Sequence, residues 1–206
     1  MLLSLNVALT GTLALGFGSG AVLCALLTHA LLTPGVTFWP APDKSGWRHH
    51  TALGLFRIVC AAIVLAAALE VILHGAALID LAIGLPMVAA AYGVTLWGYR
   101  SLGLENTYGG AEGLVTGGLY AYTRNPQYVT SVLAGVGLAI AAASWTVLGL
   151  TGMLLAVYTL FALNEERFLV REYGQRFRDY MDATPRFIGL RSFEQAREDV
   201  EERLAR

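Results

Sequence analysis

The stretch RNPQYVTSVLAGVGLAIAAASWTVLGLTGMLLAVYTLFALNEER, residues 124–167, contains the pattern that decides the fold. Two apolar runs, at 127–143 and 146–163, meet at the residues AASW, 142–145. About 17 apolar residues is near the lower limit for a helix that crosses a bilayer. We therefore predict a tight hairpin of two short membrane helices of equal length, the second ending near Leu163. Such a hairpin places RNPQY (124–128) beside NEER (164–167) on one side of the membrane.

The composition of the whole chain supports a membrane protein. Of its 206 residues, 56% are hydrophobic and only 14% are charged, whereas about a quarter are charged in a typical soluble domain. The formal net charge of −1 gives no sign of a nucleic-acid partner. Further apolar segments at 5–32, 52–73 and 78–98 are long enough to span. We predict an all-α, polytopic membrane protein with about five transmembrane helices and a cytoplasmic C-terminal amphipathic helix.

The basic residues predict the orientation. The N-terminus, residues 74–77 and the turn at 142–145 contain no lysine or arginine, so all 14 basic residues fall on one side. Because lysine and arginine concentrate on the cytoplasmic side of membrane proteins, we predict an outer N-terminus and a cytoplasmic C-terminus. The site would then face the cytoplasm from the inner membrane. We divide the chain into membrane helices (1–112), a helical hairpin with its cover (113–188) and a charged tail (189–206).

The residues at the mouth of the hairpin suit a zwitterionic ligand. Asn125 and Pro126 form a good helix start, with asparagine as N-cap and proline at the first helical position. A helix N-terminus favours an anion, and Arg124 lies next to it. Glu165 and Glu166 supply two carboxylates on the opposite side of the hairpin. A purely structural interpretation, a capped helix and a solvated pair of glutamates, stays open.

At these residues the chain resembles the integral membrane methyltransferases of the isoprenylcysteine carboxyl methyltransferase and phospholipid methyltransferase superfamily. The similarity runs from about Gly113 to Ile188, through TGGLYAYTRNPQY (116–128) and NEERFLVREYGQRFRDYMDATPRFI (164–188). It implies S-adenosyl-L-methionine as cofactor. The residues that match the family's cofactor-binding motifs are Gly118, Tyr120, Arg124, Asn125, Pro126, Tyr128, Glu165 and Glu166. Isoprenylcysteine enzymes usually have histidine at the position of Asn125, whereas phospholipid enzymes have Asn-Pro, so the methyl acceptor stays open.

The chemistry of methyl transfer suggests the catalytic residues. In-line displacement from a sulfonium needs alignment and desolvation more than a strong acid or base. A carboxylate or thiolate acceptor is already nucleophilic, whereas an amine needs a base, for which Glu165 or Glu166 is nearest. Arg124 or Arg186 would orient a carboxylate acceptor through paired hydrogen bonds. We expect catalytic roles for Arg124, Glu165 and Arg186, a lipophilic acceptor and no metal, since His49 and His50 have no third ligand at usable spacing.

Four other segments carry expectations of their own. The segment 37–50 is a connector with interfacial tryptophans or, alternatively, a lid over the substrate entry. Glu70 and His74 are expected to extend to the outer interface, and the residues after 166 to form one amphipathic helix that Pro185 ends. Residues 189–206 are expected to be an exposed helix or a frayed tail. The alternative functions are a sterol-reductase-like enzyme that binds NADPH and a non-catalytic membrane scaffold.

Overall fold

The computed structural model describes residues 1–41, 43–102 and 113–204, and within these ranges the chain is helical with no strand. Residues 103–112, with the predicted domain boundary at 112, therefore lie outside the described residues. The all-α prediction is confirmed. The helices in chain order are α1 (Leu2–Leu32), α2 (Trp47–His74), α3 (Leu78–Leu102), α5 (Leu119–Tyr122), α6 (Pro126–Ala141), α7 (Trp145–Tyr173), α8 (Gln175–Ala183) and α9 (Leu190–Leu204).

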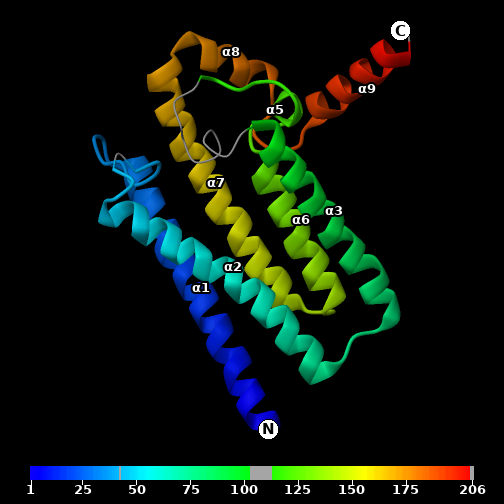
Figure 1. The fold of residues 1–206 in the computed structure, drawn as a ribbon. Coiled ribbons are helices and arrows are strands. Elements are labelled where there is room, and N and C mark those ends of the chain that lie inside the picture. Colours follow the sequence, from blue (N-terminus) through cyan, green and yellow to red (C-terminus); the bar gives the residue numbers. More distant parts are fainter. Residues whose placement is uncertain (42, 103–112, 205–206) are drawn as a thin grey trace.

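Four of these helices are long and apolar enough to cross a membrane, namely α1, α2, α3 and α7. The fifth predicted span is α6, which is apolar but has 16 residues. At about 1.5 Å per residue it is shorter than the roughly 30 Å hydrocarbon core. Helix α7 contacts α1, α2 and α6, while α3 packs along α6 (Figure 1). The chain is an integral membrane protein built around α7.

Small residues bring the helices close together. A side chain at Gly84 of α3 would overlap the backbone of Gly137 and Ala141 in α6. In the same way, Gly135 of α6 lies against Thr151 of α7. Membrane helices associate through such close backbone contacts because lipid supplies no hydrophobic force between them. Close packing at these small residues therefore holds α3, α6 and α7 together.

The turn between α6 and α7 confirms the predicted hairpin. Ser144 caps α7 by accepting a hydrogen bond from the backbone N–H of Val147 at 3.3 Å. Glu70 of α2 accepts hydrogen bonds from the hydroxyl groups of Ser144 and Thr146, at 3.0 and 2.8 Å, and contacts His74 at 2.8 Å. The Glu70 carboxylate, which was expected to extend to the outer interface, is thus held at the turn of the hairpin with 12% of its side chain exposed.

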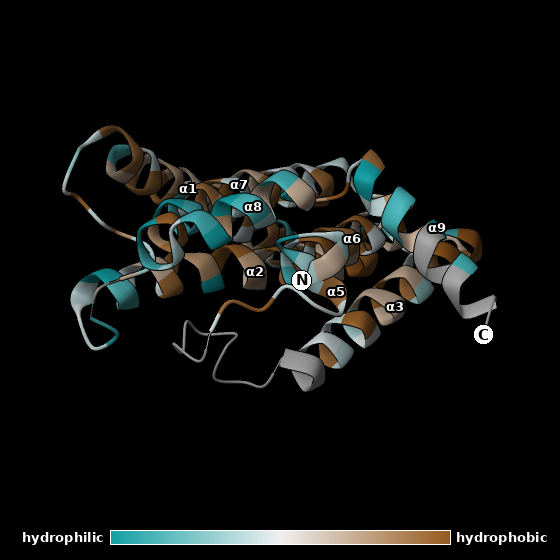
Figure 2. Cartoon of the chain, turned by 90° about the horizontal axis from the view of Figure 1, so that it is seen from above, coloured by the Kyte–Doolittle hydropathy of each residue, from teal (hydrophilic) through white to brown (hydrophobic). Residues whose placement is uncertain are grey.

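The ends of the hairpin opposite its turn differ from the prediction. Helix α7 does not end near Leu163 but continues through the charged residues to Tyr173, so the two helices are unequal. Charged side chains do not end a helix, whereas Gly174, with φ +57°, does. The single amphipathic helix predicted after residue 166 is wrong for the same reason, since Gly174 separates the end of α7 from α8. Figure 2, seen from this end, shows hydrophilic residues gathered on α8 and at the start of α2. The predicted tail forms α9.

Candidate functional site

Helix α6 begins where the sequence predicts, but the residues just before it form hydrogen bonds with the segment that follows α8. Pro126 occupies the first turn, and Asn125 is the N-cap residue without a capping hydrogen bond from its side chain. The Asn125 amide instead donates to the backbone carbonyl of Arg186 at 3.0 Å, and Thr123 Oγ1 donates to the same oxygen at 3.1 Å. Asn125 is thus the N-cap residue, as predicted, but its side chain makes no capping hydrogen bond. The Asn125 amide therefore links the start of the hairpin to the segment that follows α8.

Arg124 lies at the centre of this junction. Its side chain is 9% exposed. Nη1 donates to the backbone carbonyls of Met181 and Thr184, at 2.8 and 2.6 Å, and Nη2 donates to Glu166 Oε1 at 2.8 Å. The guanidinium thus connects the start of α6 with α7 and with the end of α8.

Glu166 is held by a second arginine. Arg186 Nε donates to Oε1 at 2.8 Å, and Arg186 Nη2 donates to Oε2 at 2.7 Å, which is a paired guanidinium–carboxylate contact. The hydrogen bond to Glu166 also raises the pKa of Arg186 above its usual range. We call Arg124, Glu166 and Arg186 the clasp. Arginine side chains of the protein donate hydrogen bonds to both oxygens of the Glu166 carboxylate. The charge of this carboxylate is therefore paired within the clasp.

Glu165 lies in a different environment. Its Oε1 accepts hydrogen bonds from Tyr128 Oη at 2.8 Å and from Trp39 Nε1 at 2.7 Å. The Tyr128 ring stacks on Tyr158 with centroids 4.2 Å apart, and Trp39 packs on Phe161 at 4.9 Å. We call Trp39, Tyr128, Tyr158, Phe161 and Glu165 the Glu165 cluster. Within the described ranges, Oε2 of Glu165 makes no hydrogen bond, so this carboxylate retains one acceptor for a ligand.

The remaining residues of the predicted cofactor set lie on α5. Gly118 precedes α5 with φ +62°, a conformation that glycine adopts without strain. The backbone carbonyl of Tyr120 accepts a hydrogen bond from Tyr180 Oη at 2.6 Å. Burial raises the pKa of Tyr180 well above its usual range. The Tyr120 carbonyl therefore helps to dock α8 on α5.

Trp39 is the residue that the sequence prediction missed as part of the site. It lies 126 positions before Glu165, in the connector between α1 and α2. The imidazole of His49 stacks on its indole at 5.8 Å. The sequence pointed to a role for this connector in the site only through the alternative interpretation of residues 37–50 as a lid. In the part of the chain that the structure describes, no three histidine, cysteine, aspartate or glutamate residues are grouped to hold a metal ion.

The comparisons with known proteins bear on the same region. Residues 79–176, just under half of the chain, match the family model described as phospholipid methyltransferase. The match contains Gly118, Arg124 and both glutamates and ends before Arg186. Searches of curated proteins and of solved structures found no significant match. The match supports methyl transfer as the general class of activity. Residues 79–176 thus match the phospholipid methyltransferase family, which confirms that the chain resembles the superfamily of integral membrane methyltransferases.

Proposed function

We propose that the protein is an integral membrane methyltransferase that uses S-adenosyl-L-methionine to methylate a lipophilic substrate. The acceptor would be an isoprenylcysteine-type carboxylate or a phospholipid amine. The single observation that carries the proposal is the position of Glu165, a half-satisfied carboxylate among aromatic rings inside the matched segment. The site would face the cytoplasm from the inner membrane.

The residues of the Glu165 cluster suit this cofactor. S-adenosyl-L-methionine carries an ammonium group and a sulfonium, and both are cations. The free Oε2 of Glu165 is an acceptor for the ammonium group, and a cation beside it would also be attracted by the electron-rich aromatic rings nearby, such as Tyr128. The donors on Oε1 hold the carboxylate in one orientation, so little freedom remains to be lost when a ligand binds.

The clasp has a positioning role in this proposal. Both terminal nitrogens of Arg124 are already used, by Glu166 and by two carbonyls. Direct contact of Arg124 with a cofactor carboxylate would require these hydrogen bonds to break. We therefore assign to Arg124, Glu166 and Arg186 the task of holding α8 over the hairpin mouth. The catalytic roles predicted for Arg124 and Arg186 become positioning roles, and Glu165 remains the catalytic candidate.

The reaction follows from these assignments. When bound, S-adenosyl-L-methionine supplies an electrophilic methyl group on a positively charged sulfur. A carboxylate acceptor needs no base, so Glu165 would only orient the cationic donor. An ammonium acceptor must first lose a proton, and Glu165 would then act as the base instead of binding the ammonium group of the cofactor. Aromatic side chains surround Glu165 with apolar surface.

Calorimetric titration of S-adenosylhomocysteine into the detergent-purified protein tests the proposal. We expect the wild type to bind and Glu165→Gln to bind about tenfold more weakly, since a hydrogen bond to a charged group contributes roughly 1.5–3 kcal/mol. Glu172→Gln, at an exposed position near the end of α7, is the matched control and should bind like the wild type. A folded wild type that binds NADPH but not S-adenosylhomocysteine would overturn the proposal.

A further inference from the structure

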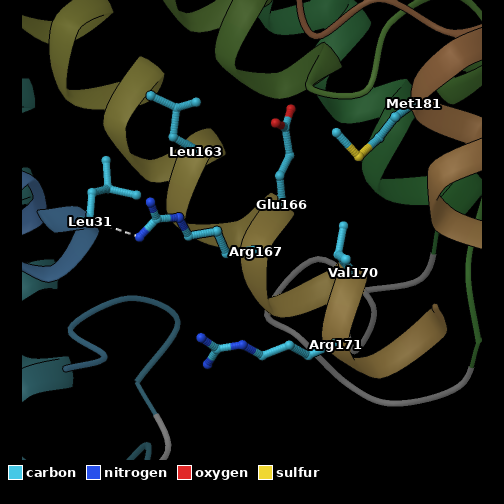
Figure 3. A pocket seen from close by; sticks show the side chains of 7 residues that line it. All are labelled: Leu31, Leu163, Glu166, Arg167, Val170, Arg171 and Met181. Carbon is cyan, nitrogen blue, oxygen red and sulfur yellow. Dashed lines mark hydrogen bonds between the residues drawn. The ribbon is translucent and has the colours of Figure 1, made fainter. Parts of the chain in front are cut away.

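An open cavity of about 510 Å³ lies between the ends of α1 and α7 and helix α8 (Figure 3). Leu31, Leu163, Val170 and Met181 form its apolar wall. In the close-up, Arg167 extends from α7 toward Leu31 of α1, and Arg171 extends from α7 on the same side, one turn further along the helix. The same cavity is therefore lined by both apolar side chains and guanidinium groups.

The cavity and the Glu165 cluster lie on different faces of α7. Tyr158, Phe161 and Glu165 follow one another at helical spacing on the face toward Trp39 and Tyr128. Leu163, Arg167, Val170 and Arg171 recur on another face at spacings of three and four, which is the period of a helix. A ligand in the cavity would therefore not occupy the position beside Glu165.

The length of α7 places the two arginines at the membrane surface. Trp145, the first residue of α7, is 85% exposed and suits the opposite interface. Roughly 20 residues of helix cross the hydrocarbon core, which brings the inner boundary close to Glu165. Arg167 and Arg171 then lie at the level of lipid head groups, and Leu163 lies just inside the hydrocarbon.

The side chains around the cavity carry more positive than negative charge. Arg167 Nη1 donates to the carbonyl of Leu31 at the end of α1, which holds its guanidinium beside the cavity. Arg171 is exposed and, within the described ranges, has no hydrogen bond or ion pair. Among the described residues that line the cavity, only Glu166 has a carboxylate, and two arginines already neutralise it. The cavity thus presents uncompensated positive charge.

We propose that this cavity binds the phosphate of an anionic phospholipid, with Arg167 and Arg171 on the phosphate and an acyl chain along Leu31 and Leu163. A guanidinium group presents paired donors that fit phosphate oxygens. The cavity opens at the depth where a lipid places its phosphate above its acyl chains. This inference does not depend on the proposed methyl transfer.

Native mass spectrometry of the full chain in detergent tests the proposal. The probes are phosphatidylglycerol, phosphatidylcholine with the same acyl chains, glycerol 3-phosphate and inorganic phosphate. We expect one phosphatidylglycerol molecule to bind more tightly than phosphatidylcholine, and neither soluble phosphate to displace it. Arg171→Gln and Arg167→Gln should each weaken its binding roughly fivefold, the change that corresponds to about 1 kcal/mol per basic residue at an anionic surface.

Arg178→Gln is the matched control, because it removes the same charge from an exposed position on α8 outside the cavity. It should leave phosphatidylglycerol binding unchanged. Equal binding of the two lipids, equal loss in Arg178→Gln, or displacement by inorganic phosphate would each overturn the proposal. Folding of every variant is checked by its thermal unfolding temperature, and Arg171→Gln, which breaks no hydrogen bond among the described residues, decides the outcome if Arg167→Gln is unstable.

Discussion

Arg124 and Glu166 are separated by 42 positions in the chain, yet Arg124 Nη2 lies 2.8 Å from Glu166 Oε1. Both side chains are about nine-tenths buried. The contact closes the mouth of the α6–α7 hairpin, and Arg186 completes it from the C-terminal segment. Ion pairs therefore connect the mouth of the hairpin to the C-terminal segment that covers it.

Removal of the central carboxylate of the clasp should loosen the C-terminal cover. Glu166→Ala leaves the buried Arg124 guanidinium without its counterion, and breaking a buried pair in this way costs roughly 3–5 kcal/mol. We expect a lower unfolding temperature in detergent and faster tryptic cleavage after Arg186. Glu201→Gln, which breaks the exposed contact with Arg197 at 3.4 Å, should change neither property. Equal protease resistance of wild type and Glu166→Ala would show that the cover is held by other contacts.

The hydrogen bond from Trp39 should set the orientation of Glu165. Trp39→Phe keeps an aromatic ring against Phe161 but removes the N–H donor to Oε1. A net loss of about 1.5 kcal/mol for a hydrogen bond to a charged group corresponds to roughly tenfold weaker binding of S-adenosylhomocysteine in calorimetry.

Trp47→Phe is the control for this change, because Trp47 is 67% exposed and lies at the start of the next helix. It should bind like the wild type. If Trp39→Phe also binds like the wild type, the connector between α1 and α2 takes no part in ligand binding.

The close approach of α3 and α6 should tolerate no side chain at Gly84. A Cβ there would overlap the backbone of α6, which cannot yield as a flexible side chain would. We expect Gly84→Ala to destabilise the protein by several kcal/mol, as overpacking commonly costs about 1–3 kcal/mol even where side chains can adjust. The measurement is the unfolding temperature in detergent, with the elution profile as a check on aggregation.

Gly93→Ala is the matched control in the same helix, since nothing lies within 4 Å of the added Cβ. Alanine favours a helix over glycine by about 1 kcal/mol, so this variant should be as stable as the wild type or more stable. Equal stability of the two alanine variants would contradict the close packing of α3 on α6.

Much of the fold was predictable because membrane insertion leaves a strong local signal. Long apolar runs located α1, α2, α3 and the hairpin, since a spanning helix must satisfy its own backbone. The hairpin then brought Arg124 toward the two glutamates through helix geometry alone. The end of α7 was not predictable from hydropathy, because a helix continues into water as long as its backbone permits.

The pairing of the site residues required information that no local pattern contains. The adjacent residues Glu165 and Glu166 carry the same charge, yet one accepts from an indole and a phenol and the other from two guanidinium groups. Which partner each receives depends on where the α1–α2 connector and the segment after α8 return to the hairpin. These are contacts between distant segments, and spacing along the chain does not determine them.

The orientation of the bundle is open to a direct chemical test. The connector at 33–46 and α8 lie at one end of the bundle, whereas residues 75–77 and the N-terminus lie at the other (Figure 1). The basic residues predict that the first end is cytoplasmic. In a background with Cys24→Ala and Cys60→Ala, Ser45→Cys and Ala77→Cys place single exposed thiols at the two ends.

A membrane-impermeant maleimide added to intact cells should modify Ala77→Cys and spare Ser45→Cys, because only the former would face outward. Both should react after the membrane is dissolved in detergent, which confirms that each thiol is accessible. The reverse pattern in intact cells would place the clasp and the Glu165 cluster on the outer side. Since S-adenosyl-L-methionine is made and kept in the cytoplasm, that result would also contradict the proposed use of this cofactor.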